Sequence, residues 1–207
     1  RSTLDRSSAA SDVYKRQIQD SALAAGARRV QLIEEPIAAA IGAGLPISEA
    51  TGSMVVDIGG GTTEIAVMSL GGVVYSNSLR IAGDAMDHSL SNYMRKEYNL
   101  LIGDSSAEKI KKEIGTAIPT NSNRYPVKGR DMRSGTPKEV NISEEDTSEA
   151  LNPIIREIVN GIKDALENTP PELSADLVDM GLTLTGGGSL LKNIDKRFGK
   201  ETGLPVH

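Results

Sequence analysis

An acidic side chain followed by three glycines is the feature of this sequence best suited to chemistry. Asp57 lies in the apolar run Met54–Ile58. The stretch after that run consists of Gly59, Gly60, Gly61 and Thr62. Glycines let a backbone approach a phosphate closely, and successive N–H groups in such a turn form a concavity that binds anions. Because a carboxylate repels a bare phosphate, the combination favours a phosphate that carries a cation, such as magnesium bound through a carboxylate and water. The plainer interpretation, a glycine hairpin with a solvated aspartate, stays open at this point.

Two better-known phosphate-binding motifs do not fit this stretch. A P-loop requires Gly-Lys-Ser/Thr, and no lysine follows these glycines. A dinucleotide-binding fingerprint requires glycines that open a helix, whereas the alternating segment Thr63–Met68 predicts a second strand here. The stretch is therefore expected to link one strand to another.

A second glycine cluster lies near the end of the sequence, between an apolar run and a helical pattern. Its members are Gly186, Gly187 and Gly188. Free N–H groups at the start of a helix can face an anionic ligand. Taken alone, the cluster is equally typical of an ordinary strand-to-helix turn.

A third feature is an acidic residue placed directly before a proline. Glu35 precedes Pro36 where an alternating segment gives way to a helix rich in alanine. A glutamate at such a junction can orient a water molecule. The plainer interpretation is an acidic helix start that complements the helix dipole.

The surrounding pattern predicts an α/β fold that can position these residues. Apolar runs and alternation predict strands over Arg29–Glu34, Met54–Ile58, Thr63–Met68, Val73–Leu79 and Leu182–Thr185. Helical periodicity, prolines and capping residues predict helices over Ile18–Ala25, from Pro36, over Asp84–Tyr98 and Ser106–Ile118, from Ser143, and over Ser189–Phe198. The Thr169-Pro170-Pro171 step is expected to end the helix that starts at Ser143, and Pro205–His207 resembles the start of a further strand.

The segment Pro119–Val140 predicts an exposed hairpin because it is rich in proline, glycine, asparagine and arginine. Its basic residues are Arg124, Lys128, Arg130, Arg133 and Lys138. Acidic residues lie among them, so the plainer interpretation is a solvated face rather than a contact with a polymer or partner.

Composition excludes several classes of protein. The 207 residues include no cysteine and two histidines, which excludes a disulfide scaffold and thiol chemistry and disfavours a histidine-rich metal site. There are 23 basic and 28 acidic residues, giving a net charge of −5, whereas a dedicated nucleic-acid-binding protein is usually basic. We therefore expect no nucleic-acid partner. No apolar run reaches the ~18 residues required to cross a bilayer.

The motifs above occur in a longer ordered series. Its segments are IEEPIAAAIGAGLP (Ile33–Pro46), MVVDIGGGTTEIAVMSLGGVVYS (Met54–Ser76), RIAGDAMD (Arg80–Asp87), NLLIGDSSAEKIKKEIG (Asn99–Gly115) and LTLTGGGSLLKNID (Leu182–Asp195). Together they resemble the actin-like ATPase superfamily, and within it most closely the bacterial actin homologues of the MreB type. The resemblance extends over residues 18–207.

The resemblance implies an actin-like, ribonuclease-H-like α/β fold in which two halves of a duplicated structure clamp a nucleotide. This chain would form most of the second half, with a mixed sheet flanked by helices and a smaller α+β lobe. The implied division places a nucleotide-binding core over 18–83 and 143–207 and an inserted lobe over 84–142. Residues 1–17, which are polar, are expected to be a non-native or disordered leader.

The resemblance also implies roles for individual residues. Asp57 would act on magnesium through water, and Glu35 would position the water that attacks the nucleotide. The phosphate-gripping hairpin would consist of Gly59, Gly60, Gly61 and Thr62, and the adenosine loop of Gly186, Gly187 and Gly188. Gly83 would approach the ribose, and Glu108 with Lys111 would flank the adenosine. The plainer interpretation of that last pair is a surface ion pair, and both side chains are expected to be exposed on their helix.

The function implied by the resemblance is that of a cytoskeletal filament protein that maintains rod cell shape by organising cell-wall synthesis. Slow hydrolysis of ATP (or GTP) with Mg²⁺ would control the polymer. The implied partners are further copies of the protein and membrane-associated proteins of cell-wall synthesis. The protein would be cytoplasmic and, when polymerised, would lie at the inner face of the cell membrane.

The family's first phosphate loop and its membrane-contacting elements belong to an N-terminal half that does not match this sequence. The 207 residues alone are therefore expected neither to hydrolyse ATP nor to form ordered filaments. Two alternatives from the same superfamily remain open: the nucleotide-binding half of a heat-shock-type chaperone, and a sugar or acetate kinase. Thr63-Glu64 stands where chaperones favour Phe-Asp, and no candidate general base for a kinase occurs between Asp57 and Gly186.

Overall fold

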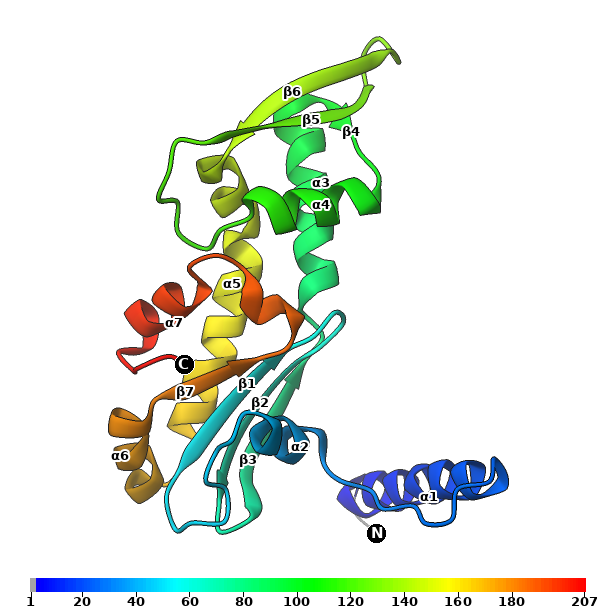
Figure 1. The fold of residues 1–207 in the computed structure, drawn as a ribbon, viewed down its shortest axis with the longest axis vertical. Helices are drawn as coiled ribbons and strands as arrows, with labels where there is room; N and C mark the ends of the chain where they lie inside the picture. The colour runs from blue at the N-terminus through cyan, green and yellow to red at the C-terminus, as the bar shows by residue number, and fades with distance from the viewer. Residues whose placement is uncertain (1–2) are drawn as a thin grey trace.

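The computed structural model describes residues 3–207 and contains two β-sheets joined by long helices (Figure 1). The strands are β1 (Ser53–Ile58), β2 (Thr63–Ser69), β3 (Gly72–Leu79), β4 (Leu100–Leu101), β5 (Arg124–Asp131), β6 (Pro137–Ser143) and β7 (Leu182–Thr185). The helices are α1 (Thr3–Ala24), α2 (Glu35–Gly42), α3 (Gly83–Tyr98), α4 (Asp104–Ile114), α5 (Glu144–Glu167), α6 (Pro171–Met180) and α7 (Ile194–Thr202), with a 3₁₀ turn, η1, over Gly187–Leu190.

The larger sheet has the strand order β3-β2-β1-β7. Strands β1, β2 and β3 form an antiparallel meander, whereas β7 pairs with β1 in parallel. Strand β1 is almost continuously apolar because both of its faces are covered. Val55 on one face packs against α2 through Ala40, and Val56 on the other face belongs to the core that includes α5.

Helix α5 links the two sheets and runs beside α3 between them (Figure 1). Its apolar residues recur at helical spacing and are buried in the main core, among them Ile155, Ile158 and Ile162. Gly161 lets the helix approach the large sheet closely, since a β-carbon there would lie 2.6 Å from Leu79 and 3.0 Å from Ile65. The start of α5 is a capping box in which Ser143 and Asp146 satisfy each other's backbone N–H groups.

Several elements predicted from sequence are confirmed. The strand-hairpin-strand series β1, β2 and β3, the helices α2, α3 and α5, and the exposed hairpin β5–β6 all occur near their expected positions. Residues Pro205–His207, predicted to start a further strand, form a single parallel bridge between Val206 and Leu182 beside β7 rather than a full strand.

Other boundaries were predicted wrongly. Arg29–Glu34 forms no strand: it alternates, yet no described strand lies beside it to pair with. Helix α4 ends at Ile114, and the expected helix Ser189–Phe198 is divided into η1 and α7 at Asn193, which has a left-handed φ of 58°. The short strand β4 and helix α6 were not predicted. The proline pair before α6 was interpreted only as a stop, although proline also favours the first turn of a helix.

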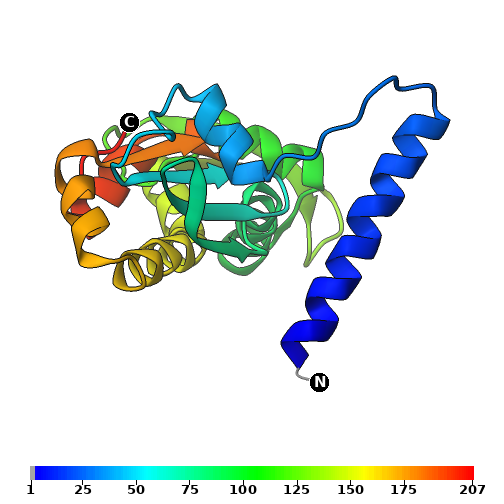
Figure 2. The same ribbon diagram turned by 90° about the horizontal axis from the view of Figure 1, so that it is seen from below.

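The N-terminal segment was expected to begin its helix at Ile18, and this is wrong because α1 begins at Thr3. In both views α1 lies apart from the two sheets (Figures 1 and 2). Residues 1–2 of the expected leader lie outside the described residues. The foreign origin of residues 1–17 stays a prediction, as does the division into a core (18–83 and 143–207) and a lobe (84–142).

Within residues 3–207, no helix is both long and apolar enough to span a membrane.

Replacing Ser143 with alanine removes the side-chain acceptor for the N–H of Asp146 at the start of α5. We expect the free energy of unfolding to fall by about 1 kcal/mol, the usual cost of losing an N-cap. Urea unfolding followed by circular dichroism measures the change. Ser105→Ala, at an exposed position in the first turn of α4, is the matched control and should stay within about 0.5 kcal/mol of the parent. Equal losses in the two variants would contradict a stabilising cap.

Candidate functional site

The two glycine clusters meet at the carboxyl end of β1. Strands β1 and β7 pair in a register that sets Asp57 opposite Thr185, so the chain leaving β7 enters Gly186 directly beside the aspartate. A β-carbon at Gly186 would collide with the Asp57 carboxylate and with the carbonyl oxygen of Ile58. Gly186 also has a φ of +80°, a conformation that other residues rarely adopt. Only glycine therefore allows this loop to lie against the end of β1.

The hairpin between β1 and β2 is attached to the start of α3. The N–H groups of Gly83 and Asp84 donate to the carbonyl oxygens of Gly59 and Gly60, at 3.1 and 2.8 Å. Across the hairpin, the N–H of Gly59 donates to the carbonyl of Thr62 at 2.9 Å. These bonds use carbonyl groups of the hairpin and fix it at the N-terminus of α3.

Three N–H groups of this hairpin remain available for a ligand. Those of Gly60, Gly61 and Thr62 donate to no other group within the described chain, and all three residues are exposed. Backbone donors gathered in one exposed turn suit an anion such as phosphate.

Lys111 on α4 reaches the same region. Its side chain was predicted to be exposed, but it is mostly buried. Its ammonium group donates to the carbonyl of Gly83 at 3.0 Å and to the carboxylate of Asp87 at 2.8 Å. Its side chain is 17% exposed. The expectation that it faces solvent is wrong because α3 lies against its face of α4.

Glu108 is exposed, as predicted, but it pairs with Lys112 at 2.6 Å rather than with Lys111. The surface ion pair considered for Glu108 and Lys111 is therefore not formed. The hydrogen bond that Lys112 donates to the Glu108 carboxylate lowers the pKa of Glu108 and raises the pKa of Lys112.

Glu35 lies in the first turn of α2, with Pro36 after it, as the sequence predicted. It is exposed and makes no hydrogen bond with another described residue. The structure brings together Asp57, the hairpin Gly59–Thr62, Gly83, Lys111 and the loop Gly186–Gly188 through hydrogen bonds to the backbone and close approach. No such bond or approach joins Glu35 or Glu108 to that group in the described structure.

Two polar residues of the site were missed by the sequence analysis. The Thr185 hydroxyl is buried beside Asp57 and has no hydrogen-bond partner in the described structure. The Oδ1 atom of Asp87 is also buried without a hydrogen-bond partner there. Burial raises the pKa of Asp87, although Lys111 opposes that effect. Their position relative to the glycines could have revealed these residues as candidates, because Thr185 directly precedes the second glycine cluster and Asp87 follows Gly83 by one helical turn.

The residues fit a magnesium ion that is held mainly by phosphate and water. Asp57 pairs with no cation of the described chain, and no group of three histidine or acidic side chains that could cage a metal occurs within residues 3–207. Magnesium retains several waters and commonly takes one or two carboxylates in addition to substrate phosphates. A lone carboxylate beside free backbone donors matches that demand.

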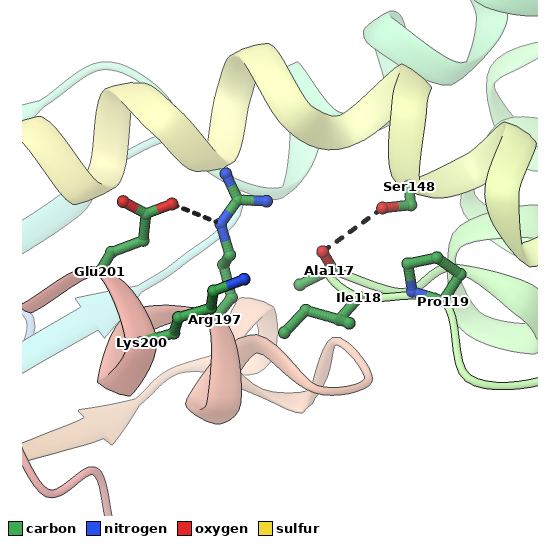
Figure 3. Close-up of a pocket in the computed structure, with 7 residues that line it drawn as sticks. All are labelled: Ala117, Ile118, Pro119, Ser148, Arg197, Lys200 and Glu201. Atoms are coloured by element: carbon green, nitrogen blue, oxygen red, sulfur yellow. Dashed lines mark hydrogen bonds and ion pairs between the residues drawn. The ribbon is translucent and has the colours of Figure 1, made fainter. Parts of the chain in front are cut away.

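A separate hollow of about 310 Å³ lies between α5, α7 and the segment that follows α4 (Figure 3). Its lining residues are Ala117, Ile118, Pro119, Ser148, Arg197, Lys200 and Glu201. Arg197 donates to Glu201 at 3.1 Å and to Asn152 at 3.0 Å, so its charge is already paired. Neither glycine cluster lines this hollow.

Comparison with known proteins agrees with the geometry. The family model described as MreB/Mbl protein matches residues 6–207. The chain is 54% identical over 198 residues to the cell shape-determining protein MreB of Escherichia coli, covering 95% of this chain and 57% of that protein. It is 45% identical over 195 residues to the cell shape-determining protein Mbl of Bacillus subtilis, covering 94% of this chain and 59% of that protein. The chain therefore spans less than two thirds of the length of these relatives.

Solved structures share the fold of this chain. MreB 5 of Spiroplasma citri bound to AMPPNP superposes with a TM-score of 0.90 at 40% identity, over 93% of this chain and 58% of that chain. The same protein bound to ADP matches equally well. A MamK filament structure, at 22% identity and a TM-score of 0.68 over 84% of this chain and 53% of that one, shares the fold. The chain belongs to the MreB/Mbl family and has the actin-like ATPase fold.

Proposed function

We propose that this chain supplies one side of a magnesium-nucleotide site in a bacterial actin-like filament protein that maintains cell shape. The observation that carries the proposal is the meeting of Asp57 with both glycine clusters at the end of β1. Relatives named as cell shape-determining proteins and a structural neighbour bound to AMPPNP and to ADP support it. ATP is the proposed nucleotide, with GTP as the other candidate.

In this proposal the backbone of the hairpin binds phosphate and the second glycine cluster approaches the adenosine. The free N–H groups of Gly60, Gly61 and Thr62 donate to phosphate oxygens, while Gly186, Gly187 and Gly188 pass beside the nucleoside. Gly83 lies next to the ribose, held by its bond to Gly59. Lys111 supplies a positive charge at the carbonyl of Gly83. Glu108 flanks the base on its solvent-exposed side.

Hydrolysis depends on positioning and charge compensation rather than on a covalent intermediate. Asp57 would hold the magnesium ion through water, and the ion would neutralise charge on the phosphates. Glu35 accepts a hydrogen bond from the attacking water and so orients it. Because Glu35 is exposed and bonded to no other described residue, its carboxylate is free for that task.

The wider role is proposed on the same basis. The protein assembles with further copies of itself, and slow nucleotide hydrolysis controls the life of the polymer. It acts at the inner face of the cell membrane with membrane-associated proteins of cell-wall synthesis. No feature of the described residues favours the chaperone or the kinase alternative.

Asp57→Asn tests the magnesium assignment in the full-length protein. The amide keeps the shape of the side chain but loses its charge, so nucleotide affinity in the presence of Mg²⁺ should fall by about 10–100-fold. Titration with a fluorescent ATP analogue, with and without Mg²⁺, measures the effect. Asp195→Asn on α7 is the control. An affinity that responds to Mg²⁺ as strongly as in the parent protein would refute the assignment.

Glu35→Gln tests the role in hydrolysis. We expect phosphate release to slow by ~10²–10³-fold, a typical cost of losing a single orienting or stabilising group. The affinity for the nucleotide should stay unchanged, because Glu35 is not expected to contact it. Glu34→Gln, at the neighbouring exposed glutamate, serves as the matched control. If both variants hydrolyse ATP at the parent rate, Glu35 does not position the water.

Gly186→Ala tests the close approach of the second loop to β1. The methyl group collides with Asp57 and Ile58 in a left-handed backbone, so the free energy of unfolding should fall by more than about 1 kcal/mol and nucleotide affinity should fall with it. Gly103→Ala is the control, since nothing lies within 4 Å of a β-carbon there and Gly103 belongs to neither glycine cluster. Thermal unfolding and nucleotide titration measure both variants, and indistinguishable results would contradict this account of the loop.

A further inference from the structure

The chain that follows the second glycine loop is attached to a segment that follows α4. We call Thr116–Asn121 the connecting segment. The N–H of Ala117 donates to the carbonyl of Lys192 at 2.8 Å, and the side-chain amide of Asn193 donates to the carbonyl of Ile118 at 3.0 Å. Figure 3 shows Ala117 and Ile118 beside α5 and α7. The chain after η1 is therefore joined to the connecting segment by hydrogen bonds of both backbone and side-chain groups.

A buried carboxylate lies at the centre of this attachment. Glu144, the first residue of α5, is 0% exposed. It accepts hydrogen bonds from the N–H groups of Thr120 and Asn121 at 2.8 and 3.0 Å and from the ammonium of Lys192 at 3.0 Å. The bond from Thr120, followed by those from Lys192 and Asn121, lowers the pKa of Glu144 to about 2, although burial opposes the shift. The carboxylate is therefore ionised at neutral pH.

The three groups that meet at Glu144 come from elements that border the proposed site. The connecting segment continues α4, which carries Lys111 to the carbonyl of Gly83. Lys192 follows η1 and hence the glycines that lie against Asp57 and Ile58. One carboxylate thus holds both sides of the space in which the nucleoside is proposed to lie.

We propose that Glu144 is a positioning residue for the nucleotide site: through Lys192 it holds the loop Gly186–Leu190 at a fixed separation from α4. This inference rests on the proposed function. Lys192 is half exposed but its partner Glu144 is buried, so losing this ion pair is expected to cost some stability. The position of the loop is the effect that distinguishes a positioning role from a purely structural one. Glu144 stays bonded to the backbone of Thr120 and Asn121 when Lys192 is changed, so the fold is retained.

Lys192→Met in the full-length protein removes only this ion pair. We expect affinity for a fluorescent ATP analogue with Mg²⁺ to fall about tenfold, since coupling through a supporting group of this kind is of that order. Hydrogen–deuterium exchange at the amides of 187–190, measured without nucleotide, should accelerate about tenfold. The melting temperature should fall, because the buried carboxylate of Glu144 loses its cation. Lys192→Arg, which keeps a cation that can reach Glu144, should restore both properties.

Lys163→Met is the matched control. Lys163 also pairs with a carboxylate beside α5, Glu201 at 3.6 Å, and its side chain is similarly exposed, but it does not touch the connecting segment. It should leave affinity and loop exchange unchanged. If Lys192→Met equals Lys163→Met in both measurements, the positioning role is refuted while the proposed function stands. If the parent protein binds no nucleotide, both the positioning role and the proposed function are refuted. Faster exchange without weaker binding refutes the positioning role as well.

Discussion

The parallel pairing of β1 with β7 is the contact on which the site depends. It sets Asp57 opposite Thr185, and the chain then turns at Gly186 against the carboxylate and the carbonyl of Ile58. A shift of one residue would move the aspartate to the opposite face of the sheet, because side chains alternate along a strand. The glycines are required by this approach: a side chain at Gly186 would force the loop away from β1.

The elements predicted correctly from the sequence are those with local signals. Alternation and the turn glycines predicted β1, β2 and β3, and Ser143 with Asp146 predicted the start of α5. Arg29–Glu34 was predicted wrongly because alternation reports one covered face but not whether a partner strand exists. At the site, Asp57 and the glycines could be recognised from their order. The burial of Lys111 could not, because Asp87 lies on a different helix.

The burial of two polar atoms near the candidate site could not be predicted from the sequence either. Thr185 and Asp87 each carry a buried oxygen without a partner in the described structure, and both flank backbone of the proposed nucleotide site. Buried polar atoms without partners are few in folded proteins, and each one asks for an explanation such as a bound ligand. Sequence patterns do not reveal them, since a threonine in a strand and an aspartate in a helix have nothing unusual in their local context.

The position of β7 has a consequence for the order of folding. Strand β1 reaches its parallel neighbour only after residues 59–181 have been synthesised, and pairings between distant segments form slowly. Until then one edge of a highly apolar strand has no partner, which is the condition under which unfinished chains associate with one another. The antiparallel meander of β1, β2 and β3 would therefore form before β7 completes the sheet, and β1 would be an edge strand with one unpaired side during that interval.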